Sequence, residues 1–224
     1  ESVFLEYYHC VGKSPAVILK TQKLKIEKGF IGGVSLTTIS FSAENENKSL
    51  TQTNFSSSTK PSLGFFMDIV LPRSQEKWSI YNEILFNSYQ SSGGYTDFAH
   101  EDKYTDYEIA IGASYLSMSN MIRYRLPLKG FKMIFNVGLS NGLLISNTNS
   151  EKSTLHFFGT ERVKEGLALE SLRGFETGIA AGIGLSHNKL SMEIRGVWGN
   201  GLSPYSGLKS TATRFLFQLA YRLN

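Results

Sequence analysis

The sequence predicts an all-β protein, an eight-stranded antiparallel transmembrane β-barrel with short periplasmic turns, long extracellular loops and both termini in the periplasm. Three observations predict this fold. Large apolar residues alternate with small or polar residues in segment after segment, which is the period of a β-strand. No run of roughly 18 apolar residues could cross a membrane as a helix. The connections between the alternating segments are long and short in turn, as in outer-membrane barrels.

The composition agrees with one domain and a short appendage. The chain has 224 residues, a net charge of +4 at pH 7 and one cysteine, Cys10. Its Lys and Arg residues are scattered rather than clustered, so no nucleic acid partner is expected. A single cysteine excludes an intramolecular disulfide and a thiolate metal site. Since no other metal-ligand spacing occurs, neither a metal nor a cofactor is expected.

The last segment shows the alternation most clearly, with Phe215, Phe217 and Leu219 on one face and Arg214 and Gln218 on the other. The same pattern predicts eight strands, at about residues 24–41, 63–71, 78–86, 104–126, 133–145, 175–185, 190–198 and 213–223. The fourth strand is unusually long, and its upper half (Ile109, Ile111) is in the opposite phase to its lower half. We therefore expect a β-bulge between the halves.

The apolar face of these strands is expected to point toward lipid. A soluble sandwich also alternates, but it turns its apolar face inward and its charged face to solvent. Here the apolar face is made of large, nearly uncharged residues, and the opposite face carries Gly, Ala and isolated charges. An outward Lys or Arg at mid-membrane costs roughly 2–4 kcal/mol, which explains why the apolar face lacks them. The opposite face suits an interior too narrow to be a pore.

The lengths of the connections support the same fold independently. Tight connections are expected at residues 72–77, 127–130 and 186–189. Long, polar loops are expected at 42–60, 90–103, 147–173 and 200–210. Short turns at one end and long loops at the other are typical of outer-membrane barrels, and with eight strands both termini fall at the short-turn end.

Several short motifs occur in the order and spacing of a known family. They lie at residues 32–35 (Gly-Gly-Val-Ser), 64–67 (Gly-Phe-Phe-Met), 78–85 with Glu83, 115–124, and 217–222 (Phe-Gln-Leu-Ala-Tyr-Arg). Over about 23–224 the chain resembles the PorT-like small outer-membrane barrels of Bacteroidota, although many relatives have Glu and Pro where this chain has Ser117 and Ser119. The resemblance implies the barrel fold and an outer-membrane location. It implies little about activity, because members range from secretion-system components to uncharacterised barrels.

Charged residues on the small-residue face are candidates for a polar network inside the barrel. They are Asp68, Glu83, Arg123, Glu176, Glu193, Arg195, Arg214 and Arg222. We interpret them as ion pairs that fix the strand register, in preference to a path for protons or ions, since a packed interior conducts poorly. Aromatic residues near strand ends predict girdles at the two membrane interfaces. They are Trp78, Phe131, Trp198, Tyr205, Phe215 and Tyr221.

The third long loop contains more apolar residues than a solvated loop needs. Either it folds over the mouth of the barrel, with a short helix near 162–172, or it contacts a partner through Phe157, Phe158, Leu167 and Leu169. Residues 1–22 are expected to form a periplasmic segment, a short helix plus a linker, before the barrel at 23–224.

The main functional hypothesis is a non-enzymatic barrel that acts through partners. It would be an accessory or structural subunit of a larger envelope complex, of the secretion or barrel-assembly type, or a protein that binds through its surface loops, with outer-membrane lipid and other envelope proteins as partners. One alternative is a stand-alone barrel that binds or transports a small ligand. The other is a lipid-modifying enzyme at the outer rim, with His100 or His156 as its base.

Overall fold

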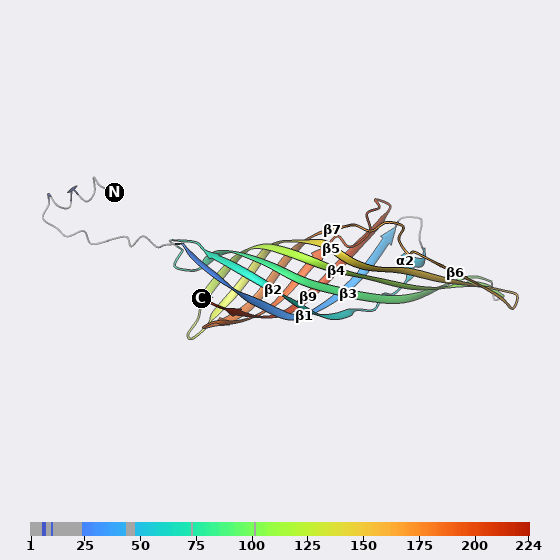
Figure 1. Ribbon diagram of the computed structural model, residues 1–224, viewed down its shortest axis with the longest axis horizontal. Coiled ribbons are helices and arrows are strands. Elements are labelled where there is room, and N and C mark those ends of the chain that lie inside the picture. Colours follow the sequence, from blue (N-terminus) through green and yellow to red (C-terminus); the bar gives the residue numbers. More distant parts are fainter. Residues whose placement is uncertain (1–5, 8–9, 11–23, 44–47, 73, 101) are drawn as a thin grey trace.

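A computed structural model of the chain describes residues 6–7, 10, 24–43, 48–72, 74–100 and 102–224 (Figure 1). The helix and linker expected over residues 1–22 lie outside the described residues, apart from isolated positions. Nine strands and one short helix lie wholly within the described residues. They are β1 (Lys25–Ala43), α2 (Lys48–Gln52), β2 (Ser58–Val70), β3 (Trp78–His100), β4 (Lys103–Pro127), β5 (Lys132–Phe157), β6 (Thr160–Gly166), β7 (Phe175–His187), β8 (Leu190–Gly199) and β9 (Leu208–Arg222).

Eight of these strands close into an antiparallel ring, which confirms the predicted fold. Each strand pairs with the next along the chain, except that β5 pairs with β7, and β1 pairs with β9 to close the ring. β6 lies outside the ring and pairs with β5 alone. The connections β2–β3, β4–β5 and β7–β8 are short and lie at one end, here called the turn end, together with the start of β1 and Asn224 (Figure 1). The opposite end is called the loop end.

The alternation places apolar side chains on the outside of the ring. On β9, Phe215, Phe217 and Leu219 are 45–62% exposed, whereas Arg214 and Gln218 on the opposite face are buried. The other ring strands also turn large apolar side chains outward. The result is an apolar band around a narrow interior.

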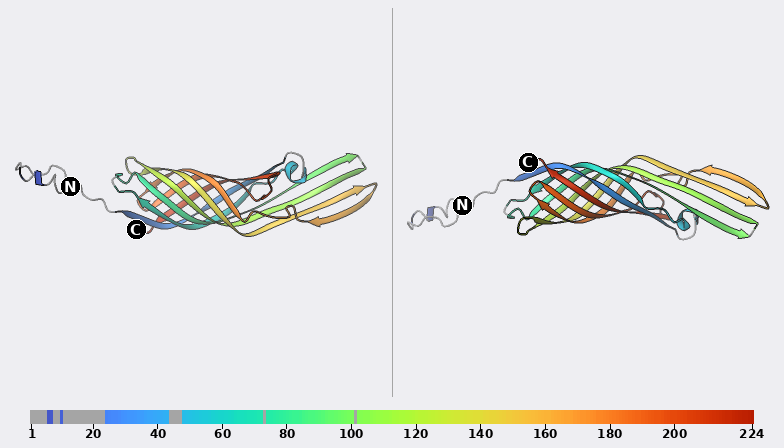
Figure 2. Two further views of the ribbon diagram at one scale, coloured as in Figure 1. Left: turned by 90° about the horizontal axis from the view of Figure 1, so that it is seen from above. Right: turned by 90° about the horizontal axis from the view of Figure 1, so that it is seen from below.

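β3 and β5 are much longer than expected, whereas β4 is about as long as predicted. β3, β4 and β5 have 23, 25 and 26 residues, whereas a strand needs only about 9–11 to cross a membrane. Figure 2 shows their hairpins, with β6, projecting beyond the ring at the loop end. The loop predicted at 90–103 is therefore wrong, as is much of that at 147–173. Both faces of this projecting sheet meet solvent, so the strands lack the apolar alternation that identifies the rest of the ring.

The helix predicted near 162–172 is also wrong. Residues Thr160–Gly166 form β6, which pairs with β5 from Phe157↔Thr160 to Glu151↔Gly166. The turn between the two strands places Phe158 and Gly159 at positive φ, 44° and 78°. The chain therefore reverses in a tight hairpin and continues the sheet instead of winding into a helix.

The bulge predicted within β4 is not there. Ile109, Ile111 and Tyr115 are buried in the same phase as Ser117 and Arg123, so β4 keeps one inward face throughout. The irregularity in the β4–β5 pair falls at the predicted height, but Ile145 of β5 is the extra residue. The phases looked opposed because the inward side chains of β4 are apolar toward the loop end and polar toward the turn end.

The interior consequently has two parts. Toward the loop end an apolar cluster fills it, including Ile39, Ile109, Ile111 and Tyr115 from the ring strands. The segments between the strands contribute Leu50 of α2, Leu169 and Leu202, each 1–3% exposed. These three leucines show that chain from the loops folds into the mouth of the ring. Toward the turn end, the interior holds charged residues among apolar ones such as Phe66 and Tyr81.

Candidate functional sites

Buried charges join opposite walls of the ring. Arg195 of β8 is 0% exposed, and its Nε and Nη2 donate to Oε1 of Glu193 over 2.8 and 2.6 Å. Its Nη1 donates to Glu83 of β3. Since β3 and β8 are four strands apart in either direction around the ring, this ion pair crosses the full width of the interior.

A second group of charges lies nearer the turn end. Arg123 donates to Asp68 (2.9 Å), to Glu193 (3.1 Å) and to the side-chain oxygen of Asn136 (2.8 Å). Its guanidinium stacks 3.6 Å above the ring of Tyr81. The interaction of the guanidinium with three acceptors and an aromatic face compensates for the cost of burying its charge.

Two members of this group were missed in the sequence. Arg125 donates to Asp68 over 2.5 Å and to Glu27 over 3.1 Å, and all three side chains are buried. Arg125 lies two residues after Arg123 and therefore on the same face of β4, a signal that could have identified it. Glu27 also accepts from Arg222 over 2.7 Å.

The remaining predicted charges sit at the two ends of the polar region. Arg214 forms a two-pronged ion pair with Glu176, with Nη2 2.8 Å from Oε2, and lies within 6 Å of the rings of Tyr89 and Tyr115. Arg222 is the most exposed of the eight residues, with 29% of its side chain accessible. Thus seven of the eight are buried in ion pairs, and Arg222 lies at the mouth.

A cavity of about 350 Å³ opens at the turn end. Its charged lining consists of Glu27, Asp68, Arg123, Arg125, Lys132, Lys189 and Arg222. Above it lie the buried charges of Arg195 and Glu83, which are 0% and 2% exposed. The cavity is therefore a polar recess at one mouth, and buried ion pairs fill the interior beyond it.

At the loop end, the side chain of Asn149 holds Leu169, which with Leu50 and Leu202 forms an apolar plug in the mouth of the ring. The side-chain oxygen of Asn149 accepts from the backbone N–H of Leu169 (3.0 Å), and its Nδ2 donates to the carbonyl of Leu169 (2.6 Å). Leu169, considered above as a partner contact, is thus buried inside the mouth. Phe157, Phe158 and Leu167 remain 47%, 71% and 62% exposed. Part of the third connection therefore folds over the mouth and part of it projects, and the contact with a partner stays a prediction.

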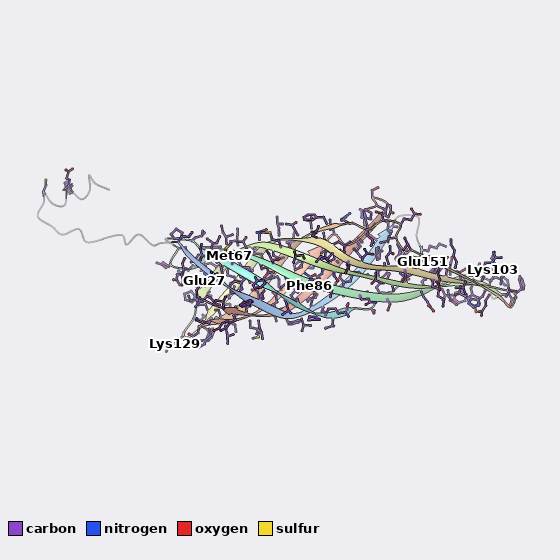
Figure 3. The ribbon with its side chains drawn as sticks, viewed as in Figure 1. Glu27, Met67, Phe86, Lys103, Lys129 and Glu151 are labelled. Atoms are coloured by element: carbon purple, nitrogen blue, oxygen red, sulfur yellow. The ribbon has the colours of Figure 1, made fainter. Side chains whose placement is uncertain are left out.

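The projecting sheet has two different faces, given by the register of β3–β6. The acidic face, which continues the outer wall of the ring, carries Thr96, Phe98, Tyr104, Asp106, Glu108, Lys152, His156, Glu161, Val163 and Glu165. The basic face, which continues the inner wall, carries Tyr95, Asp97, Lys103, Tyr107, Glu151, Leu155, Phe157, Arg162 and Lys164. In Figure 3, Glu27 and Lys129 mark the turn end and Lys103 the far tip of this sheet.

His156 is held at the centre of the acidic face. Its ring stacks on Tyr104 with a centroid distance of 4.4 Å. Its Nε2 lies 3.2 Å from Asp106 and its Nδ1 lies 3.4 Å from Glu161. Both ring nitrogens therefore face carboxylates, a poor arrangement for a base that must activate a serine hydroxyl. Among the described side chains no group of three or more His, Cys, Asp or Glu residues is arranged to hold a metal ion.

The aromatic residues proposed for the girdles lie on the outer surface. Trp78, Phe131 and Tyr221 lie near the turn end, and Trp78 packs against Tyr124 with a centroid distance of 4.8 Å. Trp198 and Phe215 lie farther toward the loop end on β8 and β9. All five are 44–47% exposed, and Tyr205 in the β8–β9 connection is 39% exposed. No helix within the described ranges is long and apolar enough to cross a membrane.

Three solved structures resemble the chain at low identity. Ail of Yersinia pestis, in complex with the heparin analogue sucrose octasulfate, is 11% identical with a TM-score of 0.36, over 89% of this chain and 99% of Ail. Neisserial surface protein A is 9% identical with a TM-score of 0.37, over 89% and 99% of the two chains. The outer membrane protein OprG of Pseudomonas aeruginosa is 10% identical with a TM-score of 0.41, over 90% and 95%. No curated protein sequence matches the chain.

A protein family also matches most of the chain. The family described as outer membrane protein beta-barrel domain matches residues 20–205, which include β1 to β8. The closed ring and its apolar outer band agree with that description. The narrower resemblance to the PorT-like barrels stays a prediction. The chain belongs to the outer membrane protein beta-barrel domain family and lies in the outer membrane, with its turn end in the periplasm and its loop end outside the cell.

Proposed function

We propose that this barrel is a non-enzymatic accessory subunit that binds another protein of the cell envelope through the projecting extracellular sheet. The observation that carries the proposal is the contrast between the two parts of the molecule. The interior is filled by ion pairs and an apolar plug, whereas the sheet of β3–β6 stands free outside the membrane. The surface available to a partner is therefore the sheet.

The sheet has the composition of a binding surface. Phe98 and Phe158 are 73% and 71% exposed, although large aromatic side chains are costly to leave in water. Aromatic residues and arginine are enriched where proteins bind one another, and Arg162 lies on the same sheet. The two faces carry charges of opposite sign, which orients a partner and rejects one with the wrong charge.

The two alternatives have less support. Transport needs a path, and Arg195 with Glu83 crosses the interior while Leu50, Leu169 and Leu202 fill the outer mouth. An enzyme at the rim needs a base next to a nucleophile, and both nitrogens of His156 face carboxylates.

The test removes the sheet and keeps the barrel. Because Gly94 pairs with Glu108 and Lys152 with Glu165, residues 95–107 and 153–164 can each be replaced by Asn-Gly, the preferred two-residue hairpin turn. Full-length and trimmed proteins, both tagged, are isolated from the native outer membrane in mild detergent, and the retained proteins are identified by mass spectrometry. A stoichiometric partner that the trimmed barrel loses supports the proposal.

Point variants make the test sharper. Replacing Phe98 and Phe158 together by Ser should release the partner, since both side chains are exposed and folding does not need them. Tyr205→Ser removes an exposed aromatic residue outside the sheet and should retain it. Retention of the partner by the trimmed barrel, or no stoichiometric partner in any sample, would overturn the proposal.

A further inference from the structure

Two asparagines face lipid in the middle of the apolar band. Asn82 of β3 and Asn120 of β4 are a register pair, and Nδ2 of Asn120 donates to Oδ1 of Asn82 over 2.6 Å. Their side chains point outward, because Ile80 and Ile122 on one side of the pair and Ile84 on the other are 43–57% exposed in the same phase. The pair is called the asparagine pair below.

The asparagine pair lies midway along the apolar stretch of β3. Along β3 the outward residues run from Trp78 through Ile80, Asn82 and Ile84 to Phe86, so Asn82 is the central one. This stretch has the length of a membrane crossing, about 9–11 residues. The matching wall of β7 and β8 carries Ile183 and Ile194, themselves a register pair, at the corresponding outward positions. In the described part of β7 from Ile179 to Leu185, and in the residues of β8 that pair with it, only apolar side chains face lipid.

The bond between the two amides uses only some of their hydrogen-bond donors and acceptors. An amide side chain has two N–H donors and an oxygen with two lone pairs. The recorded bond uses one N–H of Asn120 and one lone pair of Asn82. Both N–H groups of Asn82 and the oxygen of Asn120 face the hydrocarbon, where polar groups find no water and remain costly unless they are paired.

We propose that the asparagine pair is the centre of an intramembrane interface between two copies of this chain. A two-fold axis along the membrane normal places β3 of one copy opposite β4 of the other. Asn82 and Asn120 pair in register and so lie at nearly the same depth, which brings Asn82 of each copy to Asn120 of its mate. The free N–H of Asn82 then donates to the free oxygen of Asn120 in the other copy, twice by symmetry.

The chemistry favours a second copy over lipid. Acyl chains offer no donor or acceptor at mid-membrane, since the polar groups of lipids lie at the interfaces. The asparagine pair exposes one kind of donor and one kind of acceptor side by side, which is a self-complementary set, as an isologous contact requires. Polar side chains that hydrogen-bond across an interface are a known means of association in membranes.

The contact is confined to the band. Ile80, Ile84, Ile122 and Met118 surround the asparagine pair and supply apolar packing. Above the membrane the same wall continues into the acidic face, where Glu108 and Asp106 would repel their counterparts. The interface is thus separate from the extracellular surface proposed to bind a partner, and either proposal can fail without the other.

The experiment measures association in bilayers. Cys10 is the only cysteine and is exposed, so the full chain can be labelled there with a donor or an acceptor dye and reconstituted in phosphatidylcholine vesicles. Energy transfer is followed as the protein-to-lipid ratio is lowered. The wild-type chain should associate at least about tenfold more tightly than the double variant Asn82→Leu, Asn120→Leu.

Leucine suits the lipid face, so the double variant should fold, and heat-modifiable electrophoretic mobility checks that it does. The matched control replaces the pair Ile183 and Ile194 on the opposite wall by leucine and should associate like the wild type. Energy transfer no higher than random proximity in the wild type, or equal in the wild type and the double variant, would overturn the proposal and leave lipid or another barrel against this wall.

Discussion

Arg195 on β8 donates a hydrogen bond to Glu83 on β3, the strand directly opposite in the ring. Such a bond is possible only where two side chains span the whole interior, which an eight-stranded ring allows. Arg195 also holds Glu193 on its own strand, so two carboxylates depend on one guanidinium. This arrangement both stabilises the barrel and fills the middle of its interior.

Arg195→Met should destabilise the barrel strongly. The substitution leaves Glu83 and Glu193 buried, and removing one partner of a buried ion pair costs about 3–5 kcal/mol. Urea unfolding in lipid vesicles, followed by the fluorescence of Trp78 and Trp198, measures the loss. Arg222→Met is the control, because Arg222 lies at the mouth with 29% of its side chain exposed, and should cost much less. Equal losses for the two variants would contradict this account.

The wild-type protein should not conduct ions. The ion pairs of Arg195 and the buried leucines Leu50, Leu169 and Leu202 fill the interior. In planar bilayers at about 1 M salt the reconstituted protein should therefore give no stable conductance steps. A reproducible single-channel step would show that a path exists and would revive the transport alternative.

Asn149→Ala should free the segment around Leu169. The side chain of Asn149 makes two hydrogen bonds with the backbone of that residue, and losing them costs about 1–2 kcal/mol of local stability. Trypsin cleavage near Lys164 and Arg173 on the outside of vesicles should become about tenfold faster, since proteolysis follows the population of the opened state. Asn147→Ala, at an exposed neighbouring position, should leave the rate unchanged.

Glu76 should make a small contribution to stability that depends on pH. A hydrogen bond from Lys25 is the main cause that lowers the pKa of Glu76 below its ordinary value of 4.5, and Lys132 adds to it. Because the pKa is lower in the folded protein, the contribution is complete above the ordinary value and is lost as the pH falls through the folded value.

The comparison is between the wild type and Glu76→Gln in urea unfolding at several pH values. The side chains of Lys25 and Glu76 are both nearly half exposed. At neutral pH the difference in the free energy of unfolding between the two proteins should therefore be well under about 1 kcal/mol. It should shrink toward zero as the solution becomes strongly acidic. A difference that grows on acidification would contradict the assignment.

The strands of the ring could be predicted from the sequence because each has lipid on one face and the barrel interior on the other. Where lipid lies on one side and a narrow interior on the other, as for Phe217 and Gln218 of β9, side chains alternate and the strand can be recognised. The same reasoning located the short turns and the buried charges, including Arg123. It failed in two places: both faces of the projecting sheet meet water, and at Ile109 of β4 the interior of the ring is apolar instead of polar.

The sequence by itself thus determined the ring of eight strands, its outward apolar face and the inward position of residues such as Arg195. Only the tertiary structure decided which of these residues meet. Glu83 and Arg195 lie 112 positions apart and on opposite strands. Asn82 meets Asn120 because of the register of β3 and β4. Alternation has a period of two residues, so it tells to which face a side chain belongs, whereas the closure of the ring and the register of each pair set its height and its neighbours.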